Sequence, residues 1–244
     1  MKLHLSKNLF DLSLDIADHL VQIVGEVLKK KDSFSLVLSG GSTPVELYTL
    51  LASDAYKEKI DWEKMHIFFG DERFVSLHDE RNNARMAFTT LLNHVAVPAS
   101  QIHIIHTENV TPDQSAADYE TTIRNFFIAT KNVENKFDVV LLGLGSNAHT
   151  LSLFPGQDAV IHESKRWCLS AWVEEQQEYR ITLTPPLINL SAQIFFMVSG
   201  QDKAQAMQEV LKGKYQPENF PAQIINPSNG ELYWFADESA ASLL

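Results

Sequence analysis

The sequence predicts an α/β fold, a doubly wound and mostly parallel sheet flanked by helices. Short apolar runs that end abruptly in glycine alternate with segments of helical periodicity, a pattern typical of parallel strands buried on both faces. With 45% apolar residues, a chain of 244 residues can bury a large core. We expect a single domain over residues 1–244, with a small irregular lid or second lobe within residues 155–182.

The expected elements follow in chain order. An amphipathic helix is expected over residues 16–28, where apolar positions recur at helical spacing and three lysines follow, because cations suit a helix C-terminus. A second helical pattern begins at Pro44 and runs to residue 51. Strands are expected at residues 34–38, 67–69, 102–105, 139–142 and 194–198. In such sheets ligands bind beyond the carboxyl ends of the strands, so the turns there are candidate sites.

Composition excludes several classes of partner. The formal net charge of −11 is spread along the chain and repels nucleic acids and anionic membranes, so neither is expected as a partner. Cys168, the only cysteine, cannot form an intramolecular disulfide, and no zinc-ligand spacing occurs. The N-terminus does not resemble a signal peptide, and no apolar run approaches the roughly 20 residues of a membrane span. We expect a cytoplasmic monomer or small homo-oligomer without metal or cofactor.

The first candidate turn joins the strand at 34–38 to the following helix. Gly40 and Gly41 permit close approach of a ligand to the backbone, and the hydroxyls of Ser42 and Thr43 precede Pro44. Free N–H groups at a helix start, with hydroxyls beside them, can bind phosphate. An ordinary N-capped helix explains the same residues equally well. No GxxxxGK[ST] pattern occurs, which disfavours a nucleoside triphosphate.

Two further turns concentrate polar residues after apolar strands. Asp71, Glu72 and Arg73 follow the strand at 67–69; Arg73 can address an anion and Asp71 can orient a base or bind a sugar hydroxyl, although a local ion pair is the simpler alternative. Residues 143–148 match G-x-G-x-x-A, but Pro155 soon interrupts the helix that a dinucleotide site needs. His149 directly follows this turn, a position that favours a general base.

Two basic residues remain as candidates for binding an anion. Arg180 opens the segment RITLT, and Lys203 begins the helix after the strand at 194–198. A cation at a helix start opposes the helix dipole unless an anion binds there, although a solvated surface lysine is the simpler alternative. A net-acidic protein that binds phosphate needs such a local cluster of cations.

Taken together, these segments resemble the 6-phosphogluconolactonase family, which shares its fold with glucosamine-6-phosphate deaminases and ribose-5-phosphate isomerases. The matching segments, in family order, are SGGSTP (39–44), GDERFV (70–75), N-x-x-M-x-x-x-x-L-L (83–92), GLGSNAHTLSLFPG (143–156), RITLTPP (180–186), GQDKA (200–204) and PAQII (221–225). The resemblance implies hydrolysis of 6-phospho-D-glucono-1,5-lactone to 6-phospho-D-gluconate in the oxidative pentose phosphate pathway.

The resemblance also implies roles for individual residues. The substrate phosphate would be bound by Gly41, Ser42, Thr43, Arg180 and Lys203, with Gly40, Gly145 and Asn147 in support. His149 would be the general base that activates water, and Arg73 would face the sugar ring or its oxyanion. A lactone is an activated ester, so one base of unshifted pKa, typically contributing 10² to 10⁴-fold, can suffice. Backbone N–H groups of the glycine turn can stabilise the oxyanion.

One departure from the family pattern concerns the residues before His149. The family commonly has Asp-Gly there, whereas this chain has Asn147 and Ala148. Asparagine keeps a hydrogen-bonding oxygen but loses the charge that would stabilise the protonated imidazole, so His149 should be a weaker base. Alanine at 148 predicts that the turn does not need a positive φ at that position.

Several rival functions are weighed against these residues. Glucosamine-6-phosphate isomerases, which deaminate their substrate, have a signature resembling DGHIAFNEP, with a glutamate five residues after the histidine where this chain has Phe154; this favours hydrolysis. A non-catalytic phosphosugar-binding protein would be expected to have lost His149. A serine hydrolase would need a GxSxG elbow, which is absent, and the interrupted helix disfavours a dinucleotide oxidoreductase.

Overall fold

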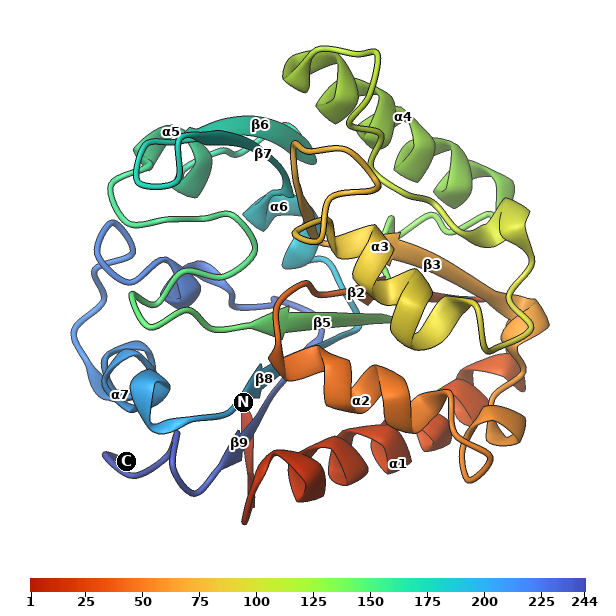
Figure 1. Cartoon of the computed structure of the whole chain (residues 1–244), viewed down its shortest axis with the longest axis horizontal. Helices are drawn as coiled ribbons and strands as arrows, with labels where there is room; N and C mark the ends of the chain where they lie inside the picture. Colours follow the sequence, from red (N-terminus) through yellow and green to blue (C-terminus); the bar gives the residue numbers. More distant parts are fainter.

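The computed structural model describes residues 1–244 as a six-stranded sheet and a three-stranded sheet with surrounding helices (Figure 1). The strands are β1 (Lys2–Ser6), β2 (Phe34–Leu38), β3 (Met65–Phe69), β4 (Asp71–Arg73), β5 (Val139–Gly143), β6 (Cys168–Val173), β7 (Glu178–Leu183), β8 (Gln193–Val198) and β9 (Glu231–Asp237). The helices are α1 (Leu9–Leu28), α2 (Thr43–Leu51), α3 (Asn83–Ala87), α4 (Pro112–Ala129), α5 (Asp158–Ile161), α6 (Pro185–Ile188) and α7 (Ala204–Lys212). None of the helices is long and apolar enough to cross a membrane.

The large sheet has the strand order β1-β9-β8-β5-β2-β3, and every neighbouring pair is parallel. The order reverses between β5 and β2: the chain continues from β5 outward to β8 and β9, and from β2 outward to β3. Ligands of doubly wound sheets bind at such a switch point, beyond the carboxyl ends of the strands. The predicted doubly wound parallel sheet is therefore confirmed.

Helices cover both faces of this sheet, with α1 and α4 on opposite sides (Figure 1). On one face, His19 of α1 packs against Phe195 of β8, with ring centroids 5.5 Å apart. On the other, Phe126 of α4 packs against Phe68 of β3 at 5.0 Å. Because both faces are covered, all five residues of β2 are buried, which explains the continuous apolar runs in the sequence.

One predicted strand is wrong. Residues 102–105 form no strand; only Ile102 makes a bridge, to Ile67 on the edge strand β3. The amide of His103 donates to the backbone oxygen of Ile67, and the chain then leaves the sheet. A side-chain contact holds the following segment instead: the Ser115 hydroxyl donates to the backbone oxygen of His106. The apolar run was a sign of burial and not of strand pairing.

The terminal strands β1 and β9 and the second sheet were not predicted. The second sheet is antiparallel, with the order β4-β7-β6, and β6 and all but the last residue of β7 lie within the segment 155–182 that was expected to be irregular. That expectation is wrong for the hairpin, although a single domain with a lid remains a prediction. A polar turn, residues 174–177, separates two short strands and conceals their pattern in the sequence.

Candidate active site

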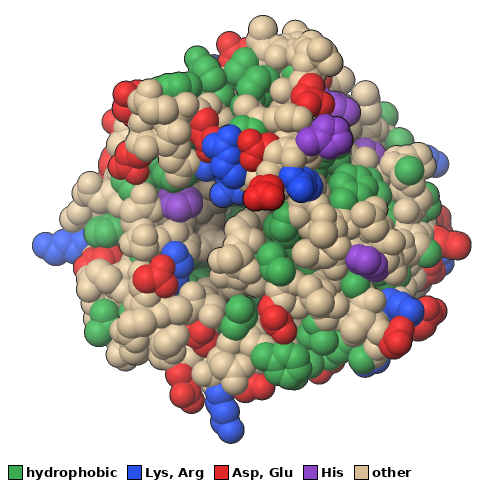
Figure 2. Space-filling view, in the orientation of Figure 1, with side chains coloured by type: hydrophobic (Ala, Val, Ile, Leu, Met, Phe, Trp, Pro, Cys, Tyr) green, Lys and Arg blue, Asp and Glu red, His purple; other side chains and the backbone are tan.

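Four turns at the carboxyl ends of β2, β3, β5 and β8 meet around a cleft of about 240 Å³. Ten of the eleven residues singled out in the sequence line it: Gly40, Gly41, Ser42, Thr43, Asp71, Arg73, Gly145, His149, Arg180 and Lys203. The eleventh, Asn147, lies outside the lining and contacts His149. Figure 2 shows a hollow on this face with Lys and Arg side chains gathered around it. Positively charged side chains therefore gather at the cleft although the molecule as a whole carries a net negative charge.

The β2 turn presents hydrogen-bond donors to the cleft. Tyr48, fully buried on α2, fixes the turn because its hydroxyl accepts from the Ser39 amide and donates to the Ser39 oxygen, at 2.9 and 2.8 Å. Gly41 has a φ of 97°, a conformation that favours glycine. Ser42 precedes α2 without capping it through its side chain. The N–H groups of Ser42 and Thr43 and the neighbouring hydroxyls are therefore available to an anion, whereas the Val45 N–H donates to the Ser42 oxygen.

The β5 turn places His149 and sets its tautomer. A Cβ at Gly145 would lie 2.0 Å from His149 Nδ1, so only glycine leaves room for the ring. The backbone N–H of His149 donates to Asn147 Oδ1 at 3.2 Å, which identifies the atom facing the histidine as oxygen. Because that oxygen also lies 2.6 Å from Nδ1, the Nδ1 atom carries the proton. The lone pair is left on Nε2, where a general base needs it.

The turn also corrects the inference drawn from Ala148. The φ of Ala148 is 62°, so the position does require the left-handed conformation, which glycine adopts without strain. The conformation allows Ala148 N to donate to the Gly145 oxygen and Gly145 N to donate to the His149 oxygen, closing a tight loop. The methyl group of Ala148 is fully buried in the core. Tertiary packing therefore maintains a backbone conformation that alanine alone disfavours.

The pKa of His149 departs from the expected unshifted value. Its pKa is lowered to about 4, mainly by burial; Asp71 opposes this shift, and the nearby cations Arg180, Lys203 and Arg73 add to it. Phe154 contributes to the dry surroundings, since its ring stacks on the imidazole with centroids 4.3 Å apart. The imidazole is consequently neutral at pH 7. A bound phosphate would offset the cations and so oppose their part of the shift.

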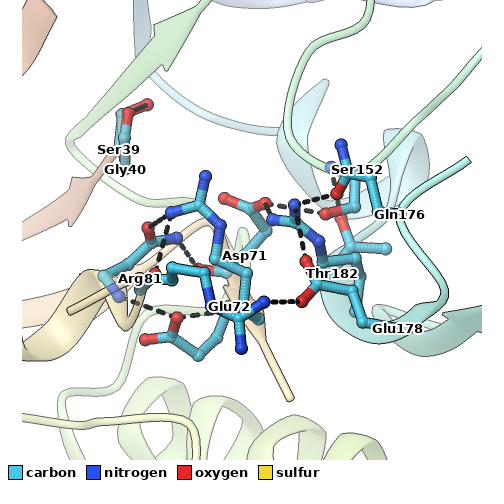
Figure 3. A network of polar contacts seen from close by, with 12 residues as sticks. Ser39, Gly40, Asp71, Glu72, Arg81, Ser152, Gln176, Glu178 and Thr182 are labelled. Atoms are coloured by element: carbon cyan, nitrogen blue, oxygen red, sulfur yellow. Dashed lines mark hydrogen bonds and ion pairs between the residues drawn. The ribbon is translucent and has the colours of Figure 1, made fainter. Parts of the chain in front are cut away.

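Asp71 and Arg180 belong to a polar network on the second sheet, of which Figure 3 labels Asp71, Ser152, Gln176 and Glu178. Asp71 Oδ2 accepts from the buried Ser152 hydroxyl at 2.7 Å and lies 4.0 Å from Arg180 Nη1. Arg180 is 5% exposed; its Nη2 contacts Glu178 at 3.0 Å and also the amide oxygen of Gln176. Its Nε is buried without a partner, an unmet donor that an anion in the cleft would satisfy.

Sequence reasoning missed several residues of the cleft. Gln176 reaches it from the tip of the β6–β7 hairpin, whose strands were not predicted, so the sequence carried no signal for it. Asn83 also lines the cleft, and its position at the head of the N-x-x-M pattern was an available signal. Lys203 lies 2.9 Å from Asp202 but still lines the cleft. No group of three or more His, Cys, Asp or Glu side chains is placed to bind a metal ion.

Known proteins resemble this chain over nearly its whole length. Residues 8–234 match the family described as glucosamine-6-phosphate isomerases/6-phosphogluconolactonase. A 6-phosphogluconolactonase of Synechocystis is 36% identical over 221 residues, covering 91% of this chain and 89% of the relative. The 6-phosphogluconolactonase from Trypanosoma cruzi has a TM-score of 0.85 at 26% identity, covering 100% and 96%. A monomeric glucosamine-6-phosphate deaminase reaches 0.84 at 20% identity over both whole chains, a likeness of fold alone.

Proposed function

The chain belongs to the glucosamine-6-phosphate isomerase/6-phosphogluconolactonase family, and we propose that it hydrolyses 6-phospho-D-glucono-1,5-lactone to 6-phospho-D-gluconate, the lactone step of the oxidative pentose phosphate pathway. The observation that carries the proposal is the placement of a neutral histidine in the same cleft as three cations and the unpaired N–H groups before α2. A phosphorylated lactone has complementary ends, an anion and an electrophilic carbonyl. The base would act at one end while the phosphate is bound at the other.

The phosphate end would be bound by the β2 turn together with Arg180 and Lys203. Gly41, Ser42 and Thr43 supply backbone N–H groups and hydroxyls without competing protein partners at the start of α2. Arg180 contributes a buried, permanently charged fork with an unmet Nε donor. Since phosphate lies remote from the reacting carbon, these contacts bind substrate and transition state about equally and mainly set KM.

At the reacting end, His149 Nε2 would accept a proton from water as the water oxygen attacks the lactone carbonyl carbon. Asn147 would orient the imidazole through Nδ1–H while positive charge develops on the ring. The tetrahedral oxyanion would be met by Arg73 and by N–H groups of the glycine turn. Its collapse breaks the bond between the carbonyl carbon and the ring oxygen, and the imidazolium returns its proton to that oxygen. Asp71 would orient the substrate by accepting from a sugar hydroxyl.

Phe154 supports hydrolysis over isomerisation within this family. The isomerase signature has a glutamate where this chain has Phe154, and here the phenyl ring stacks on the imidazole. Ring opening and isomerisation need a carboxylate that exchanges protons with the sugar, whereas Phe154 has no titratable group. The likeness of fold to the deaminase does not discriminate between these reactions, so the side chain at 154 carries the distinction.

The proposal is tested by following proton release from freshly generated 6-phosphoglucono-δ-lactone in the presence of excess chelator. Turnover well above the spontaneous rate of ring opening is expected. A rate equal to the spontaneous one would contradict the proposal. A parallel assay for ammonia release from glucosamine 6-phosphate is expected to give none, and ammonia release would instead favour the isomerase activity.

A further inference from the structure

Asn83 is a buried amide that joins separate parts of the cleft, and none of the proposed chemical steps uses it. It is the first residue of α3 and 3% exposed. Its Oδ1 accepts from Arg73 Nη1 at 2.8 Å, and its Nδ2 donates to the backbone oxygen of Asp71 at 2.9 Å. Both partners belong to β4, the strand that brings charged residues to the cleft (Figure 3). The amide thus has one defined orientation, with oxygen toward Arg73.

The β2 turn leaves a space that the Asn83 side chain fills. A Cβ at Gly40 would lie 2.1 Å from Asn83 Oδ1 and 2.3 Å from its Cγ, distances that no side chain can adopt. Gly40 has no positive φ, so its lack of a side chain serves this contact and not a backbone conformation. The phosphate-binding turn and the strand carrying Arg73 therefore meet at Asn83.

Glu72 fixes the backbone on which Asn83 stands. Its carboxylate is 1% exposed and accepts three backbone N–H groups: Oε1 from Arg73 and Asn83, both at 2.8 Å, and Oε2 from Ala84 at 2.9 Å. The pKa of Glu72 is raised to about 7, because burial outweighs the opposing effect of these three donors. The contacts tie the first turn of α3 to β4, so the Asn83 amide cannot drift relative to Arg73.

Arg73 is the residue whose geometry this arrangement controls. Its Nη1 makes both of its side-chain contacts, to Asn83 and to the backbone oxygen of Arg81 at 2.9 Å. Its Nε and Nη2 have no protein partner, and the side chain lines the cleft. A free arginine side chain samples many rotamers, whereas one anchored through a single nitrogen keeps its other donors in a defined direction.

We infer that Asn83 is a positioning residue, which holds Arg73 so that its two unpaired donors meet the reacting end of the substrate. The inference rests on the proposed lactonase function, because it assigns the guanidinium to the lactone oxygen. Asn83 would act through Arg73, because its amide oxygen and nitrogen are already engaged by Arg73 and by the backbone of Asp71. Its contribution should consequently appear in kcat, since a misdirected donor weakens the transition state more than the bound substrate.

The test compares Asn83→Ala with the matched variant Asn82→Ala. Asn82 is equally buried and caps the same helix by accepting from the Arg85 amide, but it does not contact Arg73. Asn83→Ala should lower kcat about 10 to 100-fold with KM within about 3-fold of wild type, as expected when one catalytic donor is misplaced. Asn82→Ala should lower thermal stability and leave kcat within about 2-fold, because a lost cap affects folding.

A double-mutant cycle with Arg73→Ala separates positioning from a general structural role. If Asn83 acts through Arg73, the double variant loses no more activity than Arg73→Ala alone. Additive losses, or an Asn83→Ala kcat equal to that of Asn82→Ala, would overturn the inference. If Asn83→Ala does not fold, Asn83→Ser, whose shorter side chain ends before the position of the amide oxygen that meets Arg73, replaces it in the cycle with the same criteria. Absence of lactonase turnover in the wild type would refute the proposed function. An active wild type together with an equally active Asn83→Ala would refute only the role of Asn83.

Discussion

At the scale of single residues, His149 is surrounded by groups that make it a weak but neutral base. Asn147 orients the ring without adding charge, and Phe154 covers one face of it. Burial and neighbouring cations lower its pKa to about 4. Desolvation thus keeps the His149 imidazole deprotonated at pH 7. A carboxylate in place of Asn147 would have the opposite effect, since it would raise the pKa of His149 and make it a stronger base.

The role of His149 predicts that His149→Ala lowers kcat by about 10² to 10⁴-fold, the usual contribution of a general base. Affinity for the product 6-phosphogluconate should remain within a few-fold, because the phosphate contacts are intact. Steady-state kinetics and product titration measure the two effects. His162→Ala is the control, since that side chain is exposed and pairs only with Glu218. Undiminished turnover in His149→Ala would remove the residue from its role.

The missing charge at position 147 predicts a shift in pH dependence. The base works when neutral, so activity is full above the pKa of His149 and is lost as the pH falls through it. Asn147→Asp places an opposite charge beside Nδ1 and raises that pKa, so the acidic limb of kcat/KM should move to higher pH. Rates measured from pH 4 to 8 decide this. An acidic limb that stays in place or moves to lower pH would contradict the assignment.

The phosphate site predicts a different kinetic signature for Lys203. Lys203→Ala should raise KM about 10 to 100-fold with kcat nearly unchanged, because a charged hydrogen bond is worth about 1.5–3 kcal/mol and acts on substrate and transition state alike. Lys212→Ala, at the other end of α7, removes the same charge outside the cleft and serves as the control. A loss confined to kcat would place Lys203 at the reacting end instead.

At the scale of elements, the turn after β5 predicts an unusual response to glycine. Ala148→Gly loses a buried methyl, about 0.8 kcal/mol, and adds unfolded-state entropy, but it relieves a left-handed alanine that costs about 1–2 kcal/mol. Its unfolding free energy should stay within about 0.5 kcal/mol of wild type. Ala116→Gly, equally buried inside α4, has no strain to relieve and should cost about 1.5–2 kcal/mol. Equal losses in denaturant titrations would argue against strain at 148.

At the scale of the whole molecule, stability should fall as the pH drops below neutrality. His66 and His103 stack beside the sheet edge with 3.2 Å between Nδ1 and Nε2, and burial lowers both pKa values, that of His103 to about 4. The unfolded chain binds protons at about pH 6.5, before the folded one does, so stability present above that pH is lost toward pH 4.

This linkage predicts that His103→Phe flattens the decline. Phenylalanine keeps the stack on Phe68, now at 4.4 Å, but cannot be protonated. The Tm of the wild type should drop more steeply between pH 7 and 5 than that of the variant, as scanning calorimetry or fluorimetry at several pH values would measure. Parallel curves would show that the histidine pair does not contribute to acid sensitivity.

The strands β2, β3, β5 and β8, and the glycine turns that follow them, could be predicted from the sequence. A strand buried on both faces must be continuously apolar, and a turn that closely approaches a ligand or a side chain must lack a Cβ. Both requirements are therefore visible in the residue types of a short segment of sequence. Gly40 and Gly145, which lie against Asn83 and His149, show the second requirement directly. The parallel arrangement of the strands, and the clustering of the candidate residues at one edge of the sheet, follow from the same alternation of strand, turn and helix in the sequence.

What only the tertiary structure decided depends on contacts between residues far apart in the chain. The β6–β7 hairpin brings Arg180 and Gln176 over a cleft built by turns elsewhere in the chain, and its short strands pair with each other and, through β7, with β4. The left-handed conformation of Ala148 and the lowered pKa of His149 likewise arise from surrounding packing and charge. Local residue preferences are worth about 1 kcal/mol or less, whereas burial in a closed fold exceeds them, so such features are settled when the chain packs.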